Sequence, residues 1–196
     1  MIHIYKDKGS NKTLIMLHGT GGNEHQMIPL AERIDPTANI LSIRGNINEN
    51  GMNRYFRRFK MGSYDIENYL HETDILINTI LNLSKEYNFD LENTTAIGFS
   101  NGANIALGVI QANPVVKNYI LLSPDYINKD RDFNNLDNKN IFISTADNDP
   151  YVNNLNMETL IMRLTNQNSN LKVIKTSGHE INNVVLSELI KWYNNI

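Results

Sequence analysis

Residues 94–106 read TTAIGFSNGANIA, and the interpretation of the whole chain starts from this segment. Its apolar beginning and its end, rich in small residues, predict a short strand, a sharp turn and a helix start with Ser100 at the apex. Gly98 and Gly102 lie two residues before and after Ser100, where larger side chains would collide with neighbouring backbone. Such a turn exposes the serine hydroxyl and directs the first N–H groups of the helix toward the place where an oxyanion would form.

The composition excludes several classes of protein. A chain of 196 residues is expected to form a single domain, 1–196, with one core. The formal net charge of −3 argues against a nucleic-acid partner, because a nucleic-acid-binding surface needs an excess of basic residues. Cysteine is absent, which removes disulfides, thiolate metal sites and a cysteine nucleophile.

Nothing in the sequence resembles a membrane or export segment. No apolar run approaches the length of a membrane span, and residues 1–6 lack the basic and then apolar pattern of a secretory signal. We therefore expect no membrane span and a cytoplasmic location.

Short apolar segments alternate with helical patterns along the chain, and this alternation predicts the fold class. It is typical of an α/β protein with a mostly parallel sheet of about seven strands, flanked by helices on both faces. The expected strands are residues 2–5, 13–17, 40–43, 94–99, 119–122, 141–144 and 171–175. The expected helices are residues 24–34, 67–87, the segment from the Ser100 turn to Pro114, 156–165 and a closing helix with Ile181, Val184, Val185, Leu189 and Tyr193 on its buried side.

A glycine-rich loop, His18-Gly19-Thr20-Gly21-Gly22-Asn23, follows the apolar run at residues 13–17. Glycines at the end of a strand free the backbone to turn its N–H groups toward a ligand, as in a phosphate cradle or an oxyanion hole. The loop lacks both the Gly-Lys-Ser/Thr ending of a P-loop and the glycine spacing of a dinucleotide fold. It is therefore a candidate oxyanion loop.

Residues 50–60 mix aromatic side chains with a local basic cluster. On one interpretation they form a surface excursion whose aromatic residues pack inward and whose arginines are solvated. On the other, they cover the mouth of the active site and help to select the substrate. Met52, Tyr55 and Phe56, together with Gly21 of the glycine loop, are then the substrate-binding residues.

Several polar groups are expected to meet at one edge of the sheet. Ligands of open parallel sheets bind beyond the carboxyl ends of the strands, and Ser100, residues 147–150 and His179 all follow strands. The chain order is serine, aspartate, histidine, which suits a serine nucleophile with His179 as its base and an aspartate that orients the imidazole.

The identity of the acid is less constrained than that of the base. Asp149 is favoured because Pro150 restricts the backbone just after it; Asp147 is next, and Asp125, after the preceding strand, is third. His18 is expected to brace the glycine loop rather than to act as the base. His179 has a competing interpretation as a surface residue that caps a helix.

These motifs together resemble the α/β-hydrolase fold, and within it the phospholipase/carboxylesterase branch that includes acyl-protein thioesterases and small bacterial carboxylesterases. The resemblance spans nearly the whole chain and implies the triad Ser100, Asp149 and His179, with oxyanion N–H groups from Thr20 and Asn101. It also implies an enzyme without metal or cofactor. The motifs that carry this resemblance are His18-Gly19, Gly98-x-Ser100-x-Gly102, Asp149-Pro150 and Gly178-His179. A narrower similarity is to a bacterial carboxylesterase subgroup, some of whose members are associated with hydroquinone resistance. It rests on residues 18–24, 44–46, 49–52 and 54–58.

The leading functional prediction is a serine hydrolase (carboxylesterase) that cleaves small or short-chain carboxylic esters through an acyl-enzyme on Ser100. The expected partner is a small-molecule ester, and a homodimer is left open as the assembly. An acyl thioesterase is the nearest alternative, since the same groups cleave both bonds. A non-catalytic binding protein on the same scaffold and a cofactor-free lyase or ring-cleaving enzyme are the others.

Overall fold

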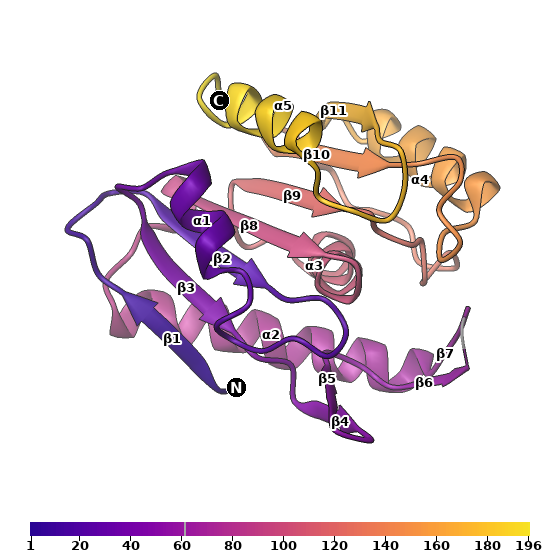
Figure 1. Cartoon of the computed structure of the whole chain (residues 1–196), viewed down its shortest axis with the longest axis horizontal. Helices are drawn as coiled ribbons and strands as arrows, with labels where there is room; N and C mark the ends of the chain where they lie inside the picture. Colours follow the sequence, from indigo (N-terminus) through magenta and orange to yellow (C-terminus); the bar gives the residue numbers. More distant parts are fainter. Residues whose placement is uncertain (61) are drawn as a thin grey trace.

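A computed structural model describes residues 1–60 and 62–196, and its centre is a seven-stranded sheet with the order β1-β3-β2-β8-β9-β10-β11 (Figure 1). The edge strand β1 is antiparallel to β3, and the remaining neighbours are parallel. This confirms the predicted α/β class and the mostly parallel sheet. The strands of this sheet are β1 (His3–Lys6), β2 (Thr13–Leu17), β3 (Asn39–Ile43), β8 (Thr94–Phe99), β9 (Asn118–Leu122), β10 (Asn140–Thr145) and β11 (Asn170–Lys175).

Helices cover both faces of the sheet, as the alternating pattern predicts. Helices α1 (Ile28–Ile34) and α5 (Asn183–Tyr193) contribute to the apolar cluster on one face. Helices α2 (Ile66–Glu86), α3 (Asn101–Ala112) and α4 (Asn154–Asn166) contribute to the cluster on the other face. A short 3₁₀ helix, η1 (Leu91–Asn93), leads into β8.

Two helix details differ from the sequence-based expectation. The helix expected at residues 24–34 begins only at Ile28, with Pro29 in its first turn, where a missing N–H costs no helical hydrogen bond. Residues 24–27 instead form turns that stay close to the glycine loop. In the closing helix, Val184 is exposed, whereas Val185 and Leu189 are buried as expected.

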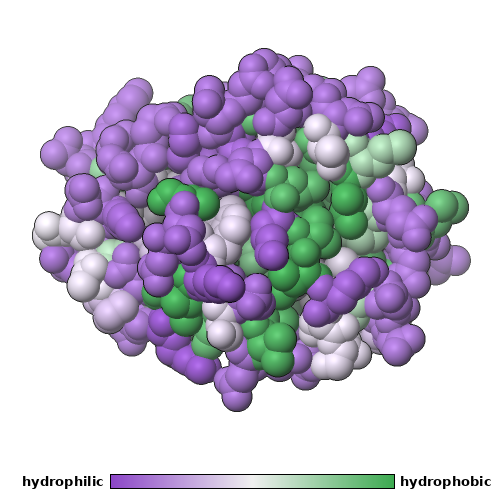
Figure 2. Space-filling view, turned by 90° about the horizontal axis from the view of Figure 1, so that it is seen from above, coloured by the Kyte–Doolittle hydropathy of each residue, from purple (hydrophilic) through white to green (hydrophobic). Residues whose placement is uncertain are grey.

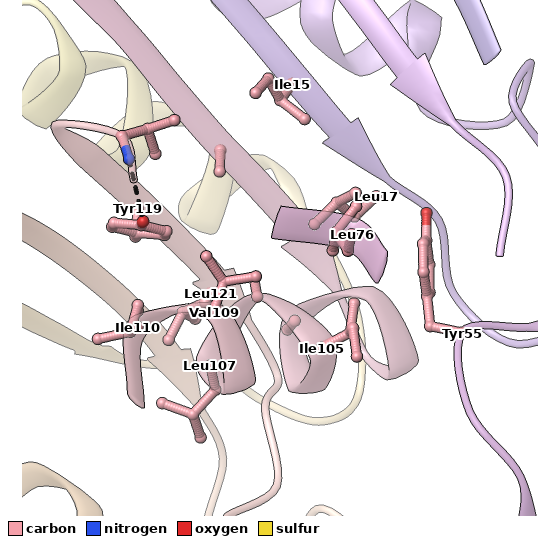
Figure 3. Close-up of a cluster of buried hydrophobic side chains, with 14 of the residues drawn as sticks. Ile15, Leu17, Tyr55, Leu76, Ile105, Leu107, Val109, Ile110, Tyr119 and Leu121 are labelled. Atoms are coloured by element: carbon pink, nitrogen blue, oxygen red, sulfur yellow. Dashed lines mark hydrogen bonds between the residues drawn. The ribbon is translucent and has the colours of Figure 1, made fainter. Parts of the chain in front are cut away.

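The sheet carries apolar side chains on both faces, and β2 shows the pattern most clearly. All five of its residues are buried; Ile15 and Leu17 face the cluster with α3, and Leu14 and Met16 face the cluster with α1. Figure 3 shows the first of these clusters, with side chains of β2 and β9 packed against the buried face of α3. A central strand buried on both faces is rigid, so its carboxyl end provides a stable base for the site.

Two small hairpins lie outside the main sheet. Strands β4 (Ile47–Glu49) and β5 (Met52–Arg54) pair with each other, and β6 (Arg58–Lys60) pairs with β7 (Ser63–Tyr64). The segment at residues 50–60 is therefore an excursion from the sheet, as the first interpretation expects, but Arg54 is buried rather than solvated and Phe59 is exposed rather than packed inward.

Strand β11 ends the sheet on the side opposite β1. Figure 2 looks onto this side and shows an apolar area among mostly hydrophilic residues. Lys172 and Lys175 are exposed along β11 between half-buried apolar residues, an arrangement that opposes pairing of an edge strand with another chain. Among the helices that the structure describes, none is long and apolar enough to cross a membrane.

Candidate active site

Ser100 sits at the sharp turn between β8 and α3, as the sequence predicts. Its backbone φ is 52°, in the left-handed region that non-glycine residues rarely adopt. The turn is tight on both sides: a Cβ at Gly98 would overlap the carbonyl oxygen of Gly102, and a Cβ at Gly102 would overlap that of Leu17. The Gly-x-Ser-x-Gly spacing is thus a steric requirement of this turn.

Three side chains from separate loops form one hydrogen-bonded row. His179, in the loop after β11, has its Nε2 2.9 Å from Ser100 Oγ and its Nδ1 2.6 Å from Asp149 Oδ2. The Asp149 side chain is fully buried, and its other oxygen accepts a hydrogen bond of 2.9 Å from the N–H of Tyr151. With Nδ1–H donating to the carboxylate, Nε2 is free to accept a proton from Ser100.

The structure separates the three candidate acids. Asp147 is 69% exposed at its side chain and forms an ion pair with Lys175, away from His179. Asp125 accepts a hydrogen bond of 3.0 Å from the hydroxyl of Tyr64, and burial raises the pKa of its carboxyl. Of the three, Asp149 is the one that contacts the histidine.

The backbone amides of Thr20 and Asn101 flank the Ser100 turn. Among the described residues, neither N–H donates a hydrogen bond, and both residues line the cavity that holds Ser100 and His179. Asn101 is the first residue of α3, where helical N–H groups have no partner within the helix. Backbone N–H groups without a partner can donate to an oxygen that becomes negatively charged.

The side chains of Thr20 and Asn101 are held by the first hairpin. Thr20 Oγ1 accepts a hydrogen bond of 3.0 Å from Arg54 Nη1, and Asn101 Oδ1 accepts one of 2.8 Å from the N–H of Tyr55. Asn53 adds two bonds to the glycine loop: its carbonyl accepts from the N–H of Gly21, and its amide donates to the carbonyl of Gly22. The sequence offered no signal for these contacts.

His18 braces the glycine loop, as expected. Its Nε2 accepts a hydrogen bond of 3.0 Å from the N–H of Gly45, so its Nδ1–H donates to the carbonyl of Gly19 at 2.7 Å. Burial lowers the pKa of this imidazole, which favours the neutral form that the two bonds require. His18 is therefore a structural link between the loop and the end of β3.

Two of the predicted substrate-binding residues are wrong, because Tyr55 and Phe56 have no exposed surface. The Tyr55 hydroxyl donates to the carbonyl of Ile43 and accepts from the N–H of His18, and the ring stands at one end of the core cluster in Figure 3. Phe56 packs edge-to-face on Tyr69, with ring centroids 4.9 Å apart. Both aromatic rings pack inward because burial of their large apolar area outweighs contact with a ligand.

The other two predicted substrate-binding residues, Gly21 and Met52, are not among the described residues that line the cavity at Ser100. Met52 is 42% exposed, contacts the position of Gly21 and borders a neighbouring surface hollow formed by the hairpins. The cavity at Ser100 has a volume of about 360 Å³. Arg54, Arg58, Tyr64 and Asp125 also line the cavity. From the sequence, Arg54 and Arg58 were expected near the site only as part of residues 50–60, Asp125 was named only as the third candidate acid, and Tyr64 was missed.

In the part of the chain that the structure describes, no group of three or more His, Asp or Glu side chains could hold a metal ion. A serine hydroxyl, a neutral imidazole and a buried carboxylate in this order form the arrangement used for nucleophilic attack on acyl groups.

Comparisons with known proteins agree with this arrangement. A family model described as Phospholipase/Carboxylesterase matches residues 3–195. MhqD of Bacillus subtilis (strain 168) is 32% identical over 195 residues, which cover 98% of each chain. The crystal structure of the Bacillus cereus carboxylesterase is 36% identical, with a TM-score of 0.93 over 98% of this chain and 93% of that chain. YahD, whose structure was determined with malic acid, is 33% identical, with a TM-score of 0.92 over 99% and 98% of the two chains. The protein thus belongs to the phospholipase/carboxylesterase family, and it is a carboxylesterase-type hydrolase with the α/β-hydrolase fold.

Proposed function

We propose that this protein is a serine carboxylesterase that cleaves small or short-chain carboxylic esters through an acyl-enzyme on Ser100. The observation that carries the proposal is the hydrogen-bonded row from Ser100 through His179 to the buried Asp149. The row opens into a cavity large enough for a small ester.

His179 is the proposed general base. As Ser100 Oγ attacks the ester carbonyl carbon, Nε2 takes the hydroxyl proton across 2.9 Å. Asp149 keeps the ring in the tautomer that accepts at Nε2 and stabilises the imidazolium. The carbonyl oxygen, which becomes negative, receives hydrogen bonds from the N–H groups of Thr20 and Asn101.

The same groups complete the turnover. The alcohol leaves with the proton from His179 Nε2, and the acyl group stays on Ser100 Oγ. A water molecule then gives a proton to His179 and attacks the acyl carbonyl carbon. Collapse of this second intermediate releases the carboxylic acid and returns the proton to Ser100.

The preference for short chains follows from the size and the lining of the cavity. A volume of about 360 Å³ lies near the lower end for ligand pockets. Its wall is mostly polar or aromatic, and Val152 is the one aliphatic residue among the described residues that line it. A long acyl chain would need an extended aliphatic channel to remove its methylene groups from water.

Substitution of the nucleophile tests the proposal. Ser100→Ala is expected to lower kcat for small esters by about 10⁴-fold or more, with an unchanged circular dichroism spectrum, because only the reacting oxygen is removed. A fluorophosphonate should add one covalent adduct to the wild-type protein and none to the variant, as read by intact-protein mass spectrometry. Ester hydrolysis retained by the variant would contradict the assignment of Ser100.

Matched esters and thioesters with the same short acyl group measure the preference between the two bond types. A thioester kcat/KM that exceeds the ester value would favour the acyl thioesterase alternative. The cytoplasmic location and the homodimer stay predictions; cell fractionation and light scattering in solution test them.

A further inference from the structure

The cavity beside Ser100 has charged groups in its wall. Arg54 from the first hairpin, Arg58 and Tyr64 from the second, and Asp125 from the loop after β9 all line it. A purely aliphatic acyl chain would leave these polar groups partly desolvated. The lining therefore suits a substrate with a charged group of its own.

The arginines of this region differ in how their charges are balanced. Arg54 has a buried side chain, and its Nε lies 3.5 Å from a carboxylate oxygen of Glu49. Arg57 points away from the cavity and pairs with Asp65 at 3.0 Å. Arg58 is half-buried, and within residues 1–60 and 62–196 no carboxylate oxygen lies within 4.0 Å of its guanidinium.

Asp125 is the carboxyl group of the cavity wall that could cancel the Arg58 charge. It accepts a hydrogen bond from Tyr64 instead, at 3.0 Å. Burial raises the pKa of Asp125, and the hydrogen bond from Tyr64 opposes this shift. Asp149, the other nearby carboxylate, uses its two oxygens for His179 and for the N–H of Tyr151. Glu49 accepts a hydrogen bond of 3.3 Å from the backbone N–H of Arg58, but its ion pair is with the Arg54 guanidinium. Among the described residues of the cavity wall, Arg58 is thus the arginine whose guanidinium has no carboxylate oxygen within 4.0 Å.

We propose that Arg58 binds an anionic group, a carboxylate, of the ester substrate. The inference rests on the proposed esterase function and names its substrate class: short esters that carry a free carboxylate, such as monoesters of small dicarboxylic acids. A guanidinium can bind a carboxylate through two parallel hydrogen bonds, which fixes the orientation of the substrate as well as its charge.

The position of Arg58 suits this role. It borders both the cavity at Ser100 and the neighbouring hollow between the hairpins, so its charge is accessible from the entrance of the site. A substrate held there by its carboxylate would present its ester group to Ser100 within the same cavity. Hydrolysis of such a monoester consumes one water and yields the dicarboxylate, the alcohol and a proton.

Proton release at constant pH measures this preference with matched esters. The probes are ethyl pentanoate, which is neutral, monoethyl succinate, which carries the carboxylate on the acyl side, and acetoxyacetate, which carries it on the alcohol side. Arg58→Gln is expected to lower the ratio of kcat/KM for the preferred carboxylated ester to that for ethyl pentanoate by roughly 10- to 100-fold, mainly through KM. Arg58→Lys should recover part of the ratio, because it restores the charge without the two-pronged geometry.

Arg57→Gln is the matched control, since it removes a neighbouring arginine that does not line the cavity. The ratio of kcat/KM for the carboxylated ester to that for ethyl pentanoate should stay within about threefold of the wild-type ratio in this variant. An unchanged ratio in Arg58→Gln, or equal loss in both variants, would overturn the inference while leaving the esterase function intact.

A binding measurement separates the two proposals. Calorimetric titration of the Ser100→Ala protein with the preferred carboxylated ester reports the subsite without turnover. Binding that is lost in Ser100→Ala/Arg58→Gln supports the inference, whereas heat of ester hydrolysis by Ser100→Ala would contradict the assignment of Ser100. Equal binding by both proteins overturns the inference, whether or not Ser100 is the nucleophile.

Discussion

The two sides of the cavity are built in different ways. On one side, Ser100, Asp149 and His179 follow strands β8, β10 and β11 of the central sheet, and backbone geometry places them. On the other side stand the hairpins β4–β5 and β6–β7, which pair only with themselves in the described part of the chain. Side-chain hydrogen bonds attach this second side to the body, among them Arg54 to Thr20 and Tyr64 to Asp125.

The difference indicates how each side responds to change. The positions of the three proposed catalytic groups depend on a buried sheet, so we expect a substitution of one of them to abolish activity rather than to change selectivity. Each hydrogen bond of the hairpin side is worth only about 1 kcal/mol, so its substitutions should have graded effects on rate and selectivity. We therefore expect substitutions in the hairpins to change which substrate is preferred while the reaction stays the same.

The sharpest test of this comparison uses two aspartates that are two residues apart. Asp149→Asn is expected to reduce kcat by about 10⁴-fold, because the amide no longer holds His179 in the tautomer that accepts from Ser100. Asp147→Asn should change kcat by less than about threefold, because it breaks only an exposed ion pair with Lys175. Steady-state kinetics on one small ester measures both.

Similar activity for the two variants would mean that the sheet side of the cavity tolerates loss of the Asp149 carboxylate. Circular dichroism spectra of both variants serve as the control for folding. A larger loss in Asp147→Asn than in Asp149→Asn would move the acid to Asp147.

The sheet side could be predicted from the sequence because local patterns determine it. The glycines around Ser100 specify the turn, and the strand order of a parallel sheet brings the residues after each strand to one edge. The restriction that Pro150 imposes favoured Asp149 over Asp147 without excluding Asp147, and the structure has Asp149 in contact with His179.

The hairpin side could not be predicted in the same way. Its contacts join residues far apart in the chain, such as Tyr64 and Asp125 or Arg54 and Thr20, and no periodicity encodes such pairs. Tyr55 was wrongly predicted to bind substrate for the same reason, because its hydrogen-bond partner, the carbonyl of Ile43, lies on a strand of the central sheet. An aromatic residue beside arginines gives the same local sequence pattern whether it faces a ligand or the core.

An intermediate effect is expected where the hairpin touches the oxyanion loop. Arg54→Gln removes the hydrogen bond to Thr20 Oγ1, which loosens a loop whose N–H must meet the oxyanion. We expect kcat to fall by roughly 10- to 100-fold with little change in KM, since complete loss of one oxyanion donor costs about 10²- to 10³-fold.

Thr20→Val tests whether Arg54 acts through this contact. It removes the side-chain acceptor but keeps the backbone N–H, so it should reproduce part of the loss in kcat. The double variant Arg54→Gln/Thr20→Val should lose little more kcat than Arg54→Gln alone, because the two residues share one interaction. Additive losses would show that Arg54 acts elsewhere in the cavity.

The smallest effect is expected behind the glycine loop, in stability rather than in rate. Glu24 forms two hydrogen bonds with Arg44 at the end of β3, and these bonds lower the pKa of the Glu24 carboxyl from 4.5 to about 2. A carboxyl whose pKa is depressed on folding adds stability that is fully present above its unfolded pKa and is lost as pH falls through the folded value. Glu24→Gln should therefore lower Tm by about 3–8 °C at pH 7.

The difference in Tm between Glu24→Gln and wild type should narrow between pH 4.5 and about pH 2, where the wild-type carboxyl takes up its proton. Glu32→Gln is the matched control, because its ion pair with Lys6 is exposed and should contribute little at any pH. Calorimetry at pH 7, 4 and 3 measures all three proteins. A Tm difference that is constant with pH would mean that Glu24 stabilises the glycine loop by packing rather than by charge.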